Sequence, residues 1–186
     1  MRLTRQNRPC LTLLALAALA IPGAAAAQPK PANPAAQATL LGQYGDWGAY
    51  TASPGGHKVC FAIAKPTTSV DNPPNRRTAA NVVYLFVSTR PDEKVSNELS
   101  VLITGYAFKP NSEATVAIGG ANFAMYTQND GAWVKNAAEE AKLLDTMRKS
   151  GDAVIKATTS RGTQTTDTFS LKGISQAVDR AAQECK

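Results

Sequence analysis

Histidine is almost absent from this chain. Among 186 residues only His57 carries an imidazole, and it lies beside the turn Pro54-Gly55-Gly56. A Ser-His-Asp or Cys-His catalytic arrangement would have to be built on this one side chain, and no serine stands in the glycine-framed pattern of a nucleophile elbow. A lone histidine at a turn is usually a solvated surface group. The sequence therefore carries no enzyme signature, and we expect no catalytic residues.

Metal and cofactor motifs are lacking as well. The chain has no CxxC pair and no phosphate-cradling glycine loop with its lysine and hydroxyl. A zinc site would have to recruit His57 and Cys60, which are three residues apart on a predicted strand and would face opposite sides of it. The carboxylate pairs Asp92-Glu93 and Glu139-Glu140 are neighbours in sequence and read as solvated charges. No metal and no cofactor are expected.

No hydrophobic run is long enough for a stable membrane anchor. The longest, Leu11 to Ile21, is too short to span a bilayer. It follows an arginine-rich start with Arg2, Arg5 and Arg8 and leads into small residues, which is the pattern of a secretory signal peptide cleaved near Ala27. We expect a mature chain that is periplasmic or secreted and has no transmembrane segment.

A strong excess of one charge is also missing. The three signal-peptide arginines account for half of the formal charge of +6, so 17 Lys and Arg face 14 Asp and Glu in the mature chain, a net +3. The basic residues are scattered, with Arg76-Arg77 and Arg148-Lys149 as the only adjacent pairs. This distribution is no electrostatic footprint for nucleic acid, and we expect no nucleic-acid partner.

Cysteine is scarce, and its number is informative. Cys10 leaves with the signal peptide, so Cys60 and Cys185 remain in a compartment where disulfides persist. An even pair in an exported chain favours one bridge. In the chain-entropy model such a long loop would stabilise the fold by roughly 4 to 5 kcal/mol. The alternative is two unpaired buried thiols.

The chain divides into three parts. Residues 1–27 are the predicted signal peptide, and residues 28–39 contain three prolines without a periodic apolar pattern, which predicts a flexible Pro/Ala-rich leader. Residues 40–186 are enough for one domain with a real core and too few for two.

Short runs of strand length recur along this domain, bounded by turn residues. They are Trp47 to Thr51, Lys58 to Lys65, Asn81 to Thr89, Glu98 to Tyr106, Thr115 to Ile118, Asn122 to Thr127, Ala153 to Thr159 and Thr163 to Leu171. The pattern is typical of antiparallel sheets, and Gly119-Gly120 is a strong hairpin signal. We predict a mainly β fold, a single antiparallel β-sandwich or partly open barrel with two short helices packed on it.

The two helices are predicted at about 137–149 and 173–183. The first has Asn136 as N-cap and Gly151 just beyond its end, with Arg148-Lys149 in the last turn. The stripes that would face the sheet are Ala137, Ala141, Leu144 and Met147 in the first helix, and Ile174, Ala177, Val178 and Ala181 in the second. The polar stretch between Lys65 and Ala80 is predicted to be a long loop.

The stretch SRGTQTTDTFSLKG, from Ser160 to Gly173, looks chemically rich. If Arg161-Gly162 is a two-residue hairpin turn, Lys156 lies directly opposite Asp167, Val154 opposite Phe169 and Thr158 opposite Thr165. Opposite charges and Thr-Thr pairs across a ladder stabilise it by roughly 0.2 to 1 kcal/mol each. This register predicts a structural hairpin rather than a reactive site.

A partner surface could be built from aromatic side chains. Tyr44, Tyr50 and Trp133 are the candidates, together with Arg161 at the hairpin tip. Large aromatic residues in a small β domain are more often core anchors, because each removes so much apolar area from water. Clustered exposure of these three rings would favour a partner surface.

Short motifs in a set order span nearly all of the domain, from Tyr44 to Cys185. They are Gly45-Asp46-Trp47, Cys60-Phe61-Ala62, Val87-Ser88-Thr89-Arg90-Pro91, Asn97-Glu98, Gly105-Tyr106, Phe108-Lys109-Pro110, Asp130-Gly131-Ala132-Trp133, Ala138-Glu139-Glu140, Ser160-Arg161-Gly162 and Thr166-Asp167-Thr168-Phe169-Ser170-Leu171. This set resembles the invasion-associated locus B family. The resemblance implies an exported, mainly β domain of a Gram-negative bacterium, periplasmic or surface-associated, with no established catalytic residues.

The resemblance also bears on the cysteines. Family members often carry a cysteine shortly after the Gly-Asp-Trp motif, where this chain has Tyr50, Thr51 and Ala52. The resemblance therefore implies that the family's usual short bridge to Cys60 is missing from this chain, and that a long bridge between Cys60 and Cys185 takes its place.

We therefore expect an exported, non-enzymatic envelope or secreted protein that binds a protein or cell-envelope partner and contributes to host-cell interaction or envelope integrity. Two alternatives stay open. An enzyme with a site near Asp167 and Arg161 would need an apolar-walled cleft converging on both groups. A small-ligand carrier would need a cavity on the order of several hundred Å³ inside the β framework.

Overall fold

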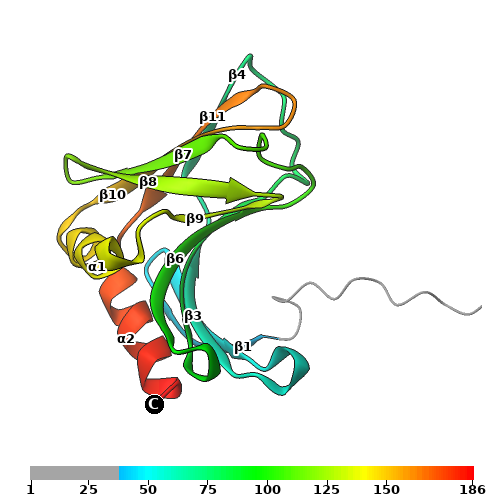
Figure 1. The fold of residues 1–186 in the computed structure, drawn as a ribbon. Helices are drawn as coiled ribbons and strands as arrows, with labels where there is room; N and C mark the ends of the chain where they lie inside the picture. Colours follow the sequence, from blue (N-terminus) through cyan, green and yellow to red (C-terminus); the bar gives the residue numbers. More distant parts are fainter. Residues whose placement is uncertain (1–37) are drawn as a thin grey trace, which may run out of the picture. The chain divides into compact units, whose positions relative to one another are not determined.

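A computed structural model describes residues 38–186, which form one antiparallel sheet and two helices (Figure 1). The predicted signal peptide and most of the predicted leader lie outside the described residues. The strands are β1 Thr39–Tyr44, β2 Trp47–Ala52, β3 Val59–Ala64, β4 Thr68–Asn72, β5 Val83–Arg90, β6 Val95–Ile103, β7 Glu113–Ile118, β8 Ala121–Gln128, β9 Gly131–Val134, β10 Asp152–Thr158 and β11 Gln164–Ser170. The α-helices are α1 Glu140–Lys149 and α2 Ile174–Glu184.

The strands follow the order β1-β2-β3-β5-β6-β9-β8-β7-β10-β11-β4, and the sheet is not closed into a barrel. Most neighbours in this order are also neighbours along the chain, so the sheet grows mainly by hairpins. The prediction of a mainly β, antiparallel fold with two packed helices is confirmed.

All eight predicted strands are present, and three further strands were missed. β1 and β4 are the two edges of the sheet, and β9 has only four residues. The prediction of a continuous loop between Lys65 and Ala80 is wrong, because β4 lies within it and pairs with β11. Polar edge strands such as TSVDN lack the alternating apolar pattern by which interior strands are recognised.

One face of the sheet forms the core together with the helices. In β3, Cys60, Ala62 and Ala64 point inward and are almost fully buried. Helix α2 packs on β1, β2 and β3, and α1 lies against β6, on the same side of the sheet in Figure 1. The predicted stripe of α2 is buried as expected, namely Ile174, Ala177, Val178 and Ala181.

The stripe of α1 differs from its prediction. Leu143, Leu144 and Met147 are buried, whereas Ala137 and Ala141 are exposed. Residues 137–139 form a separate 3-10 turn, so the helix proper starts three residues later and its buried face is rotated. The predicted cap is present, because the Asn136 side chain accepts a hydrogen bond from the Ala138 amide at 3.2 Å.

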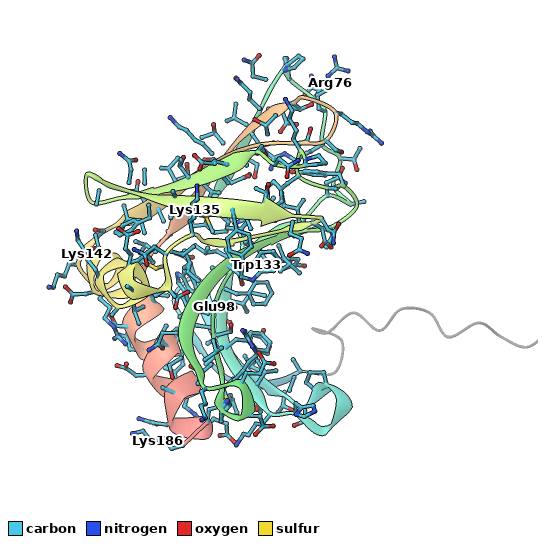
Figure 2. The ribbon with its side chains drawn as sticks, viewed as in Figure 1. Arg76, Glu98, Trp133, Lys135, Lys142 and Lys186 are labelled. Carbon is cyan, nitrogen blue, oxygen red and sulfur yellow. A yellow bond between two sulfur atoms is a disulfide. The ribbon has the colours of Figure 1, made fainter. Side chains whose placement is uncertain are left out.

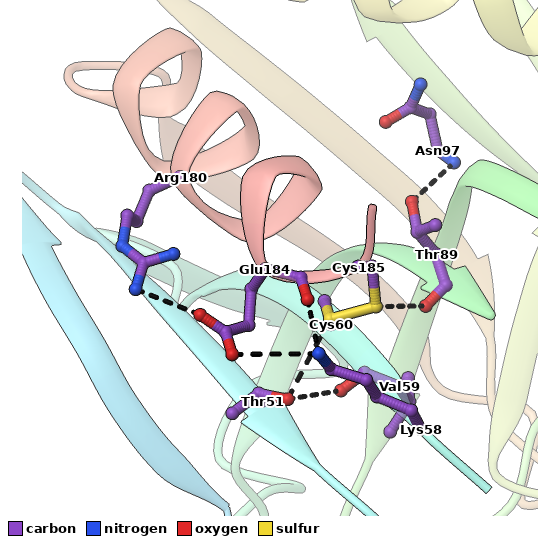
Figure 3. Close-up of a disulfide and its surroundings, with 9 residues drawn as sticks. All are labelled: Thr51, Lys58, Val59, Cys60, Thr89, Asn97, Arg180, Glu184 and Cys185. Atoms are coloured by element: carbon purple, nitrogen blue, oxygen red, sulfur yellow. Dashed lines mark hydrogen bonds and ion pairs between the residues drawn. A yellow bond between two sulfur atoms is a disulfide. The ribbon is translucent and has the colours of Figure 1, made fainter. Parts of the chain in front are cut away.

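A disulfide between Cys60 and Cys185 fastens the end of α2 to β3 (Figure 3). The two residues are 125 positions apart, and the bond confirms the predicted long bridge over the alternative of two free thiols. Beside it, the Lys58 ammonium donates a hydrogen bond to the main-chain oxygen of Glu184. The last turn of α2 is therefore held to the sheet by a covalent bond and by a polar contact.

The turn between β1 and β2 is fastened to the start of α2. The Asp46 amide donates to the Lys172 carbonyl at 3.1 Å, and the Trp47 indole donates to the Ser170 carbonyl at 2.9 Å. Gly173 has a φ of +96°, and a Cβ atom there would collide with the main-chain oxygen of Tyr44. This close approach of two backbones explains why only glycine fits at position 173.

Gly173→Ala is expected to lower the free energy of unfolding by more than about 2 kcal/mol, because left-handed backbone strain and the collision with Tyr44 add together. Urea unfolding followed by circular dichroism measures the loss. Gly151→Ala is the matched control, since a Cβ atom there meets no heavy atom within 4 Å. Equal stability of the two variants would contradict the tight contact.

The hairpin of β10 and β11 has a register one residue away from the predicted one. Lys156 pairs with Thr166, and Asp167 pairs with Ile155. The loop is longer than a two-residue turn, because Thr159 and Thr163 still bond to each other across Ser160-Arg161-Gly162, with Gly162 at a φ of +83°. A three-residue loop that ends in a left-handed glycine is a standard hairpin connection. The predicted Lys156–Asp167 pair is therefore wrong, and Asp167 points into the protein.

Candidate functional site

The face of the sheet away from α1 and α2 carries a band of apolar side chains. Successive residues of a strand point to opposite faces, so the inward Cys60, Ala62 and Ala64 leave their neighbours on the other side. We call this band the aromatic trough. Its members come from β2, β3, β5, β6 and β9 and are Tyr50, Phe61, Ile63, Tyr84, Phe86, Leu102 and Trp133. In Figure 2, Trp133 lies on the side of β6 opposite to the helices.

The rings of the trough contact one another across neighbouring strands. Tyr50 stacks on Phe61 with ring centroids 5.6 Å apart, Phe61 contacts Phe86 at 5.6 Å, and Phe86 contacts Tyr84 at 6.2 Å. Such pairs are worth about 0.5 to 1.5 kcal/mol beyond the area they bury. The contacts hold the rings in place before any partner arrives, so little side-chain entropy is left to lose on binding.

Two adjoining hollows make up the trough. One, of about 500 Å³, lies over Tyr50 and extends to Ala38 at the start of the described chain. The other, of about 300 Å³, lies between Phe86 and Trp133. Phe61, Ile63 and Tyr84 line both hollows. The result is a continuous apolar surface that crosses five strands.

Charged side chains at the hollow between Phe86 and Trp133 are paired with one another, whereas Asp46 and Lys65 line the other hollow without an ion-pair partner among residues 38–186. Arg90 forms a two-pronged contact with the Glu98 carboxylate at 2.9 and 3.1 Å and reaches Glu93 at 2.7 Å. Hydrogen bonding to Glu98 raises the pKa of Arg90 above its ordinary value. Burial, followed by the charge of Glu98, raises the pKa of Glu140 nearby. The paired charges leave the apolar floor as the dominant feature of this surface.

The structure brings together only part of the surface that the sequence suggested. Tyr50 and Trp133 lie in the trough, and Trp133 also stacks on Tyr126 at 5.6 Å. Tyr44 is half-buried against the core from β1, and Arg161 is exposed at the tip of the β10–β11 hairpin.

Phe61, Tyr84 and Phe86 were missed as members of the surface. The signal for them was the unbroken apolar character of VCFAIA and VYLFV, because a strand that is apolar on both faces has a covered or binding surface on each side. These rings were not assigned to either face from the sequence, and apolar runs alone do not tell which face of a strand packs against helices.

Asp167 belongs to a buried polar cluster. Its carboxylate accepts from Arg77 at 2.7 Å and from the Ser69 hydroxyl at 2.6 Å, and Arg77 also donates to Asp71 at 2.5 Å. Burial raises the pKa of Asp167. Arg161 makes no contact with this cluster, so the two groups of the hypothetical enzyme site do not converge in one cleft.

The remaining candidate groups are simple surface features. His57 lies 3.0 Å from the Asp92 carboxylate, and both side chains are mostly exposed. Within residues 38–186, no three His, Cys, Asp or Glu side chains gather closely enough to hold a metal ion. Neither described α-helix has the length and apolar character needed to cross a membrane.

Comparison with known families gives one match, and comparisons with curated proteins and with solved structures give none. The model described as invasion associated locus B (IalB) protein matches residues 47–182, from the start of β2 into the last turns of α2. The match contains every strand that builds the aromatic trough as well as the Asp167 cluster. It therefore covers most of the described domain, and the chain belongs to the invasion associated locus B family.

Proposed function

We propose that this chain is an exported, non-enzymatic envelope or secreted protein that acts by binding a protein partner through the aromatic trough. The observation that carries the proposal is the band of pre-stacked, partly exposed rings on a sheet face that is open on the side away from the helices (Figure 2). Contiguous apolar patches on soluble domains usually mark interaction sites.

The composition of the trough favours a protein as the partner. Aromatic residues and arginine are enriched at the centres of protein interfaces, and apolar anchors on one partner fill pockets on the other. The trough offers aromatic rings on its floor and the Arg90–Glu98 pair at its rim. Its hollows could seat two or three side chains of a protruding segment.

Export is supported by two features of the chain. The N-terminal sequence has the charge and hydropathy pattern of a signal peptide, and disulfides such as Cys60–Cys185 persist in oxidising compartments. We propose a role in host-cell interaction or in envelope integrity, in keeping with the name of the family. Deleting the gene should then change adhesion to host cells or sensitivity to envelope stress.

The proposal predicts that Trp133→Ala weakens partner capture. Truncating an aromatic anchor of an interface typically costs about 2 kcal/mol, which is about a 30-fold loss of affinity. The purified protein, carrying a photo-crosslinker at Leu102, is mixed with an envelope extract, and the crosslinked protein is identified and then titrated against the variants.

The control is Val70→Ala, which removes an exposed apolar side chain from the edge strand β4, a strand that contributes no residue to the trough. It should leave capture unchanged. Equal loss in both variants, or a crosslinked protein that differs between repeats, would sink the proposal. An unchanged far-ultraviolet circular dichroism spectrum of Trp133→Ala, with an unchanged unfolding midpoint, distinguishes a lost contact from a lost fold.

A small-ligand carrier is the second candidate, favoured by the 500 Å³ hollow over Tyr50. The hollow lies on the open face of the sheet, whereas a carrier of the predicted kind needs an internal cavity. A screen of apolar ligands by calorimetric titration tests it, and submicromolar binding would favour this candidate over a protein partner.

A further inference from the structure

A second hollow lies at the other end of the sheet, around the tip of the β10–β11 hairpin. It has a volume of about 480 Å³ and is formed by three segments, residues 73–81, 105–106 and 159–163. We call it the arginine cleft. Among the residues that line it are Arg76, Arg77, Tyr106, Thr159, Arg161 and Thr163. Figure 2 places Arg76 at the end of the domain away from Lys186.

The arginines of the described chain fall into two groups. Four of the six make an ion pair with a carboxylate, namely Arg77, Arg90, Arg148 and Arg180. Within residues 38–186 the guanidinium groups of the other two, Arg76 and Arg161, have no ion-pair partner. Both of these line the arginine cleft, although they are 85 positions apart in the sequence.

Tyr106 lines the same cleft. Its hydroxyl group is buried and has no hydrogen-bond partner among the described residues. Arg77 lies close enough to influence the pKa of this hydroxyl group, so the group is enclosed by the protein instead of facing a ligand in the cleft. Burial raises the pKa of Tyr106 to about 12. The hydroxyl group therefore stays uncharged at neutral pH, and Tyr106 contributes the surface of its ring to the cleft.

The balance of charge in and behind the cleft is positive. Asp71 and Asp167 lie behind Arg77 and are bound to it, and neither lines the cleft. Arg76 and Arg161 add two further positive charges. Planar guanidinium groups match the two oxygens of a carboxylate or phosphate, so the cleft has the donors of an oxyanion site.

The size and walls of the cleft restrict the ligand further. A volume of about 480 Å³ exceeds the needs of a bare phosphate ion. The walls are polar, with Thr78 and Asn81 bonded to each other at 3.1 Å and Thr159 and Thr163 almost fully buried, so they favour a hydrophilic ligand over one with an apolar tail. We infer that the arginine cleft binds an acidic sugar, with its carboxylate or phosphate between Arg76 and Arg161.

The inference is tested by calorimetric titration of the full mature protein. Glucuronate and glucose 6-phosphate are the probes, and glucose and inorganic phosphate are the reference compounds. Both acidic sugars are expected to bind at least tenfold more tightly than glucose and more tightly than phosphate, and the binding should weaken as salt is raised. The difference between the two acidic sugars tells which oxyanion the cleft prefers.

Three variants report on the proposed contacts. Arg161→Ala and Arg76→Ala should each reduce the affinity at least tenfold, whereas Tyr106→Phe, which removes a buried hydroxyl group, should leave it unchanged. Arg148→Ala is the matched control, because Arg148 is paired with Asp179 between the helices and should not matter. Trp133→Ala should also leave sugar binding unchanged, which separates this inference from the function proposed for the trough.

The inference fails if glucose binds as tightly as glucuronate, or if neither acidic sugar binds. It also fails if Arg161→Ala and Arg148→Ala behave alike. Equal affinity for phosphate and glucose 6-phosphate would overturn the assignment of a sugar, because the hydroxyl groups of the wall would then contribute nothing.

Discussion

Replacing Cys185 with serine is expected to lower the free energy of unfolding by about 4 kcal/mol. The disulfide joins residues 125 positions apart, and in the chain-entropy model closing a loop of that length removes a large part of the freedom of the unfolded chain. Urea unfolding of the oxidised wild type and of the variant measures the difference.

The reduced wild type is the control for this prediction. Treatment with dithiothreitol should bring the wild type close to Cys185→Ser, and the variant itself should not respond. Hydrogen exchange should accelerate most at the end of α2, next to the lost bond, because only the packing of Ala181 and the contact between Lys58 and Glu184 would still hold it. A loss below about 1 kcal/mol would mean that α2 docks equally well without its covalent link.

Arg77→Ala is expected to lower the free energy of unfolding by about 3 to 5 kcal/mol. The variant leaves Asp71 and Asp167, whose side chains are 8% and 2% exposed, without their shared cation. Removing one member of a buried ion pair leaves the other charge buried without a partner. This lowers the free energy of unfolding by more than the intact pair raises it. The neighbouring Arg76→Ala should change stability by less than about 0.5 kcal/mol, because that side chain is exposed and unpaired within residues 38–186.

The cost of Arg77→Ala should depend on pH. Burial already raises the pKa of Asp167, and loss of the nearby positive charge should raise it further. When the pKa of a carboxyl is higher in the folded than in the unfolded state, its protonation favours folding. The loss of stability that Asp167 causes in Arg77→Ala is therefore absent at pH values below the pKa of Asp167 in the unfolded chain. It grows to its full size as the pH rises through the pKa of Asp167 in the folded protein.

Unfolding of both proteins at pH 7 and pH 4 checks this dependence. The stability gap between wild type and Arg77→Ala should narrow at pH 4. A gap that stays constant would show that the loss comes from packing and hydrogen bonds of the guanidinium group instead of from the stranded carboxylate.

The register of the β10–β11 hairpin shows how far sequence reasoning reached. Both strands were recognised from their alternation, but the turn was taken as two residues long. Because the loop has a third residue, each residue of β11 pairs with the β10 residue one position before the predicted one. Side chains alternate between the two faces of a sheet, so a shift by one position moves a side chain to the other face relative to its partner strand. Asp167 thereby leaves the surface, where it would have met Lys156, and joins Arg77 in the interior. An aspartate can be buried there because β4 pairs with β11 and the segment after β4 carries Arg77. This region carries no strand signal in its sequence.

The sequence by itself determined the elements with strong periodic patterns: eight strands, two helices, and one pair of cysteines in a chain with the features of an exported protein. Alternation and capping are local properties, so residues close together in the chain are enough to specify them. The tertiary structure alone decided which face of β3 and β5 packs on the helices and which one forms the aromatic trough. It also decided that Arg76 and Arg161, remote in sequence, share a cleft with Tyr106. Such placements depend on strand order and register across the whole sheet, and no local pattern encodes them.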